Sequence, residues 1–202
     1  GSAQVIGLVH ADGNGLGQLL MDLKESTKAD DTGKVKLNDK HYVEVFKAVS
    51  EAIQKATEDA ASLAVKEVLE PNKAPASSGV TEALYPARPI VLGGDDLIMI
   101  VRADLALPFT QAFLHAFEKT SRSELKKVKE KDACKGLQEV IPDYLTACAG
   151  IAYAKSSQPF SLLNNLAEGL CKQAKKVSKL NKIKAHETSK PIEAGSVDPT
   201  IC

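Results

Sequence analysis

Residues 88–101 of this 202-residue chain read RPIVLGGDDLIMIV, two apolar runs separated only by GGDD at 93–96. Apolar, β-branched runs on both sides of a short Gly/Asp segment predict a tight β-hairpin. Asp95 and Asp96 at its tip repel each other and are costly to desolvate unless a cation lies between them. Oxygen-only ligands favour Mg²⁺ or Mn²⁺. The alternative is a solvated turn, because Gly and Asp are common turn residues.

A further acid, Asp12, comes directly after a short apolar stretch at 4–10 that predicts a buried strand. Asp12 opens the segment DGNGLG, which leads into a helix expected over about 15–24. If the strand lies beside the hairpin, Asp12 meets Asp95 and Asp96, a geometry that suits two-metal phosphoryl transfer. The N–H groups at the start of the helix would suit a triphosphate. A plain strand-to-helix turn remains the alternative interpretation.

The other apolar patterns predict a long helix over 41–69, a helix from about 107, a strand over 145–154 and a helix over 160–180. The core face of the first helix is expected to hold Val43, Phe46, Val49, Ile53, Ala56, Ala60 and Leu63. That of the second is expected to hold Phe109, Ala112, Phe113, Ala116 and Phe117. This order of elements predicts an α+β fold of βαββαβ type, with an antiparallel sheet, helices on one face and the GGDD hairpin in the centre.

Composition excludes several classes of function. Lys and Arg together number 26, as do Asp and Glu, so the formal net charge is zero and a general basic footprint for nucleic acid is absent. The four cysteines show no CxxC spacing, which argues against a zinc site and favours a reduced, cytoplasmic protein. Without an apolar run of about 18 residues or a signal peptide, we expect no membrane segment.

Three stretches together resemble a known family: LVHADGNGLG at 8–17, the hairpin at 88–101, and TACAGIAYAKSSQPFSLLNNLAEGLCKQAKK at 146–176. They are similar to the second palm domain of the large subunit of type III CRISPR effector complexes and, more distantly, to GGDEF diguanylate cyclases. The resemblance implies a ferredoxin-like palm over residues 1–182, with 183–202 as an irregular tail or the start of a missing strand. It also implies that the domain uses ATP and a divalent metal to make cyclic oligoadenylates for antiviral signalling.

The resemblance also implies roles for individual residues. Asp12, Asp95 and Asp96 would be catalytic and hold the metal, and Lys175 and Lys179 would contact the triphosphate. The glycine-rich segments would complete the nucleotide site with Gly13, Asn14, Gly15, Gly93 and Gly94. Family members often carry a second acid where this chain has Asn14, whose amide can bind a base or ribose instead. A solvated helix end is the alternative for the two lysines.

Three functions remain open at this stage. The leading one is a nucleotidyltransferase that forms 3′–5′ linked oligoadenylate, with a second palm domain (of a second copy or of the rest of a parent protein) and a CRISPR ribonucleoprotein complex as partners. The second is a diguanylate cyclase-like enzyme, which GGDD in place of GGDEF and the absence of an RxxD inhibitory pattern disfavour. The third is a catalytically inactive nucleotide-binding or interaction module. A lone histidine beside a strand end, such as His10, is more often structural than a general base.

Overall fold

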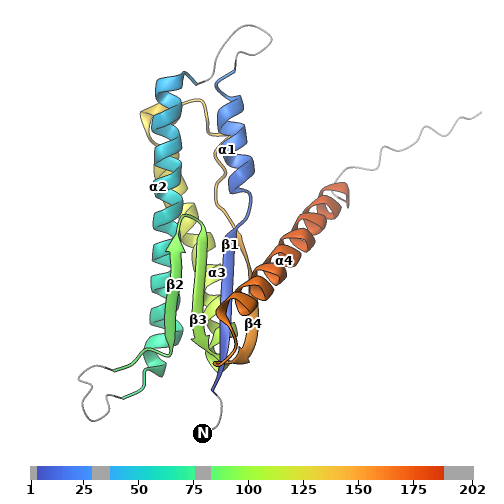
Figure 1. Cartoon of the computed structure of the whole chain (residues 1–202). Coiled ribbons are helices and arrows are strands. Elements are labelled where there is room, and N and C mark those ends of the chain that lie inside the picture. Colours follow the sequence, from blue (N-terminus) through green and yellow to red (C-terminus); the bar gives the residue numbers. More distant parts are fainter. Residues whose placement is uncertain (1–3, 29–36, 76–82, 189–202) are drawn as a thin grey trace, which may run out of the picture.

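The sheet at the centre of the protein is antiparallel, with its strands in the order β2-β3-β1-β4 (Figure 1). The computed structural model describes residues 4–28, 37–75 and 83–188. Within them the strands are β1 (Val5–Gly13), β2 (Ala87–Gly93), β3 (Asp96–Arg102) and β4 (Ala147–Lys155). The predicted α+β, βαββαβ order is confirmed. The hairpin is less central than predicted, because β3 lies inside the sheet while β2 is an edge strand.

Strand β1 is apolar on both faces, and successive side chains of a strand point to opposite faces. Val9 and Ala11 join the main core, whereas Leu8 joins a smaller core with Leu163 and Ala167. Both faces of β1 therefore need a cover. The helices are α1 (Leu16–Glu25), α2 (Asp39–Ala64), α3 (Ala103–Lys129) and α4 (Phe160–Thr188).

Two layers of helices provide this cover (Figure 1). Helices α2 and α3 pack against each other and cover one face, as predicted for the βαββαβ unit. Helix α4 follows that unit and packs on the opposite face, over β1 and β4. The expectation that all helices lie on one face is therefore wrong for α4. No helix in the described part of the chain is long and apolar enough to cross a membrane.

The predicted core stripe of α2 is partly wrong. Val43, Phe46 and Leu63 are 65%, 39% and 48% exposed. The buried apolar face consists mainly of alanines, with two valines and one isoleucine: Val45, Ala48, Val49, Ala52, Ile53, Ala56, Ala60, Ala61 and Ala64. Small side chains allow a close approach to α3, which contributes the buried Phe109, Phe113 and Phe117. The aromatic stripe of α3 is confirmed.

The predicted helix ends also differ from the structure. Helix α2 ends at Ala64, and the chain continues through a π-helical turn, Val65–Leu69. Helix α3 begins at Ala103, directly after β3, so Pro108 lies inside it rather than in its first turn. Helix α4 continues to Thr188, past the predicted end of the palm at 182. Residues 189–202 of the predicted tail lie outside the described residues.

Candidate metal and nucleotide site

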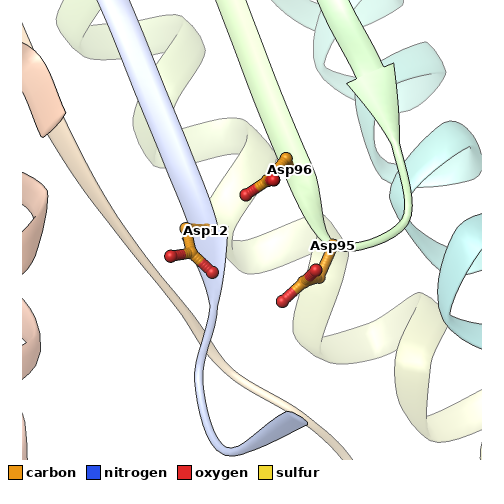
Figure 2. A group of neighbouring side chains, drawn as sticks. All are labelled: Asp12, Asp95 and Asp96. Atoms are coloured by element: carbon orange, nitrogen blue, oxygen red, sulfur yellow. The ribbon is translucent and has the colours of Figure 1, made fainter. Parts of the chain in front are cut away.

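Three carboxylates meet where β1 ends and β3 begins (Figure 2). The antiparallel register places Asp12 directly opposite Asp96, and Asp95 lies in the turn just before β3. Each of the three offers a carboxylate oxygen that lies within 4.8 Å of the other two. Asp12 and Asp95 are half-buried, and Asp96 is exposed. The three predicted acids therefore form one cluster.

Gly13 lets the acidic turn approach β1 closely. Its N–H donates to the carbonyl oxygen of Asp95 at 3.2 Å. A Cβ atom at Gly13 would lie 2.9 Å from the Cβ of Asp95, closer than real Cβ contacts. A glycine at this position is therefore required to bring the Asp95 carboxylate beside Asp12.

Helix α2 also stabilises the hairpin turn that carries Asp95. Gly94 and Asp95 connect the paired residues Gly93 and Asp96, so the hairpin has a two-residue loop. The hydroxyl of Thr57, a fully buried residue of α2, lies 2.7 Å from the Gly94 carbonyl oxygen and donates to it. Sequence reasoning missed Thr57, since a threonine within an alanine-rich helix carries no functional signal.

The environment of the cluster disfavours ionised acids. Burial raises the pKa of Asp95, and the negative charges of Asp12 and Asp96 raise it further. Burial also raises the pKa of Asp96, followed by the charge of Asp12, while His10 and Lys175 act in the opposite direction. Both carboxyl groups would be relieved by an additional positive charge among them.

Lys175 on α4 reaches the same corner of the sheet. Its Nζ atom lies 2.5 Å from Oδ2 of Asp12 and donates to the carbonyl oxygen of Gly13 at 2.9 Å. The side chains of Lys175 and Asp12 are 23% and 34% exposed. The lysine predicted for the nucleotide therefore lies at the acids and contacts one of them directly.

Gly150 of β4 makes this reach possible. A Cβ at this position would lie 2.6 Å from the backbone nitrogen of Cys171 and would collide with the carbonyl oxygen of Ala167. The backbone of α4 therefore rests directly on β4, one helical turn before Lys175. Gly150 is a second positioning residue that sequence reasoning did not identify, although it lies in the recognised AGIAYA stretch.

An open cleft of about 650 Å³ extends from the acids along the start of α1. Asp12, Asp95, Lys175 and the exposed Lys179 line it, together with Gly13, Gly15, Leu16, Gly17, Gln18, Leu20 and Met21. Gly93 is the last residue of β2 and Gly94 lies in the turn, and neither is among the lining residues. Some of the predicted site residues therefore line the cleft, and others belong to the hairpin that carries two of the acids.

Asn14 turns toward β4 instead of the acids. Its side-chain amide donates to Oγ1 of Thr146 at 3.0 Å and to the sulfur of Cys148 at 3.3 Å. Its backbone N–H donates to the carbonyl oxygen of Thr146 at 2.7 Å. In this structure the Asn14 amide therefore fastens the loop between β1 and α1 to β4.

The donor set fits Mg²⁺ or Mn²⁺. Carboxylate oxygens are the ligands these hard cations use, and three acids converge without a thiol or imidazole in the group. Burial raises the pKa of Asp95 and Asp96, and the charge of Asp12 raises both further, so a cation among the carboxylates would favour their ionised forms. Asp12, Asp95 and Asp96 are therefore the residues that would hold such an ion.

Similarity to known proteins is found among solved structures, whereas no curated protein matches the chain. The chain is similar to "Crystal structure of Csm1-Csm4 cassette in complex with cA3", with a TM-score of 0.50 and 12% identity. It is also similar to "Crystal structure of apo Csm1-Csm4 cassette", with a TM-score of 0.49 and 13% identity. Each alignment covers 87% of this chain and 20% of the other.

At 12% identity the first of these structures shows the fold alone, and the chain spans about a fifth of the length of either. A family model gives the stronger finding. The model "Cas10/Cmr2, second palm domain" matches residues 5–184, which include all the described strands, the acid cluster and Lys175. The resemblance stated from the sequence is confirmed: the chain belongs to the Cas10/Cmr2 family of second palm domains.

Proposed function

We propose that this palm domain binds ATP with a divalent metal and joins adenylate units through 3′–5′ linkages, giving cyclic oligoadenylate. The observation that carries the proposal is the convergence of Asp12, Asp95 and Asp96 beside a cleft that also holds Lys175 and Lys179. Family membership supports it. So does one solved structure of the same fold, a Csm1-Csm4 cassette in complex with cA3.

The chain's own groups have distinct tasks in this reaction. The first backbone N–H groups of α1 have no hydrogen-bond acceptor within the helix and are therefore suited to bind phosphate oxygens. They belong to Leu16, Gly17 and Gln18. Lys175 and Lys179 supply positive charge in the same cleft. A divalent ion held by the acids would neutralise charge on the phosphates and lower the pKa of the attacking hydroxyl.

The chemical step is an in-line displacement. The 3′-oxygen of one nucleotide forms a bond to the α-phosphorus of the next, the bond from that phosphorus to the bridging oxygen breaks, and pyrophosphate leaves. No side chain is assigned as general base. His10 lies two residues before Asp12 on β1, and its Nδ1 is buried without a hydrogen-bond partner in the described part of the chain.

The test is to incubate the protein with radiolabelled ATP or GTP and Mn²⁺ and to resolve the products. We expect 3′–5′ linked oligoadenylate from ATP, and none from a variant carrying Asp95→Ala and Asp96→Ala. Asp104→Ala is the matched control, because Asp104 follows the other end of β3 and pairs with Arg102. It should keep the wild-type activity.

Three results would contradict the proposal in different ways. A cyclic dinucleotide formed only from GTP would favour the diguanylate cyclase-like alternative. Binding of ATP·Mn²⁺ without product, even with the partners supplied, would favour the inactive module. Unchanged turnover in the Asp95/Asp96 variant would separate the activity from the acid cluster.

A further inference from the structure

Lys175 contacts two groups of the protein itself. Its ammonium contacts Oδ2 of Asp12 at 2.5 Å and the carbonyl oxygen of Gly13 at 2.9 Å. Both partners belong to the end of β1, whereas Lys175 comes from α4, and all three residues line the cleft. A lysine that serves only a triphosphate has no need to contact a metal ligand.

The charges at this corner are unequal. Among the described residues, the three carboxylates of Asp12, Asp95 and Asp96 have one ammonium in direct contact, that of Lys175 at Asp12. Lys179 also lines the cleft, but it is exposed and lies a helical turn further along α4. Lys175 is thus the cation that offsets Asp12, and the cluster keeps an excess of negative charge that attracts a divalent ion.

A divalent ion and Lys175 compete for Asp12. An ion that uses Oδ2 of Asp12 would lie close to the ammonium, and the positive charges of the two groups would repel each other. The lysine side chain is flexible, and the cleft beside it is open and lined by the start of α1. An incoming triphosphate offers the ammonium a new set of anionic oxygens there.

We propose that Lys175 exchanges partners during binding: it holds Asp12 when the cleft has no nucleotide, and it moves to the triphosphate when nucleotide and metal enter. This partner exchange rests on the proposed function and adds to it a sequence of binding events. By freeing Asp12, the nucleotide strengthens metal binding, and by linkage the metal strengthens nucleotide binding. Lys175 therefore opposes the metal before the nucleotide arrives and supports the nucleotide afterwards.

The exchange predicts effects of opposite sign for one substitution. Without nucleotide, Lys175→Met should bind Mn²⁺ about tenfold more tightly than the wild type, because one contacting positive charge is removed. With saturating Mn²⁺, the same variant should bind ATP about tenfold more weakly. A lysine with only a structural role would, when lost, weaken both.

Mn²⁺ binding to the whole chain is measured by electron paramagnetic resonance of the free ion, and ATP binding by calorimetry. Lys176→Met is the matched control, since Lys176 is the next residue of α4 and lies outside the acid cluster and the cleft lining. Its Mn²⁺ affinity should stay within about twofold of the wild type, since a distant charge is screened by solvent. Lys175→Gln is a second variant that removes the charge but keeps a donor for the Gly13 carbonyl, and it should behave as Lys175→Met does.

The exchange is wrong if Lys175→Met and Lys175→Gln are both folded by circular dichroism and bind Mn²⁺ no more tightly than the wild type. The proposed function fails by a different result, namely a variant with Asp95→Ala and Asp96→Ala that binds Mn²⁺ like the wild type. The two failures can therefore be told apart in a single series of titrations.

Discussion

At the scale of single residues, Gly13 controls how closely β1 approaches the acidic turn. Gly13→Ala should destabilise the protein by about 1–3 kcal/mol, the usual cost of overpacking, and weaken Mn²⁺ binding, because the new methyl group displaces Asp95. Urea unfolding and Mn²⁺ titration measure the two effects. Gly17→Ala is the control: no atom lies within 4 Å of its Cβ position, so stability should be unchanged or slightly higher. Equal stability of the two variants would refute the close approach.

The pH dependence of stability also belongs to single residues. Burial and neighbouring acids raise the folded-state pKa of Asp95 and Asp96 above the ordinary 3.8. The folded protein therefore binds more protons than the unfolded chain just above that value, and stability falls as the pH rises through the folded pKa values. In buffer free of divalent ions, a variant with Asp95→Asn and Asp96→Asn should be more stable than the wild type at pH 7.

The difference in the free energy of unfolding between the wild type and the variant with Asp95→Asn and Asp96→Asn should disappear as the pH falls below about 3.8. There the two carboxyl groups are protonated in both the folded and the unfolded state. Asp104, whose pKa is lowered by Arg102, is present in both proteins and cancels from the difference. Urea unfolding across the acidic and neutral pH range provides the measurement. A difference that does not change with pH, or that favours the wild type at neutral pH, would contradict the assigned shifts.

The three acids could be predicted from the sequence because each lies next to an apolar stretch that predicts a strand, and the register of β1 and β3 then aligns Asp12 with Asp96. The supporting residues could not. Thr57 lies 37 residues before Gly94 and acts through a buried hydroxyl, and Gly150 matters only because α4 presses on it. Such contacts depend on how the helices pack against the sheet, and the local sequence does not specify this packing. The same holds for the Lys175–Asp12 pair.

At the scale of elements, the contact of α4 with β4 sets the position of Lys175. Gly150→Ala should push α4 away from the sheet, with a loss of about 1–3 kcal/mol in the free energy of unfolding. It should also weaken ATP binding, since Lys175 is displaced. Gly169→Ala, on α4 with open space at its Cβ position, should be neutral or stabilising by up to about 1 kcal/mol. Unaltered ATP affinity in folded Gly150→Ala would mean that α4 does not position Lys175.

The elements themselves were largely predictable, because apolar periodicity distinguishes strands from helices. Two errors have physical causes. The stripe chosen for α2 favoured large residues such as Val43 and Phe46, whereas close packing against α3 selects alanines. The single helical layer followed from the βαββαβ pattern, which says nothing of a helix that comes after it, and α4 covers the second apolar face of β1.

At the scale of the whole molecule, the proposed reaction needs two nucleotides: a triphosphate at the acid cluster and a second nucleotide that presents its 3′-hydroxyl about 3–3.5 Å from the α-phosphorus. We expect a facing palm, from a second copy or another part of the parent protein, to supply that nucleotide. The isolated chain should therefore bind ATP·Mg²⁺ but turn it over slowly, with a specific activity that rises with protein concentration. A monomer by light scattering whose specific activity is independent of concentration would contradict this expectation.

The central claim is that Asp12, Asp95 and Asp96 hold a divalent ion, and anomalous diffraction from a crystal grown with Mn²⁺ and ATP tests it most directly. We predict a manganese peak between β1 and the hairpin, about 2.0–2.3 Å from oxygens of at least two of the three carboxylates, with the ammonium of Lys175 moved from Asp12 to the triphosphate. A well-ordered crystal with bound ATP but no manganese at these carboxylates would contradict the account.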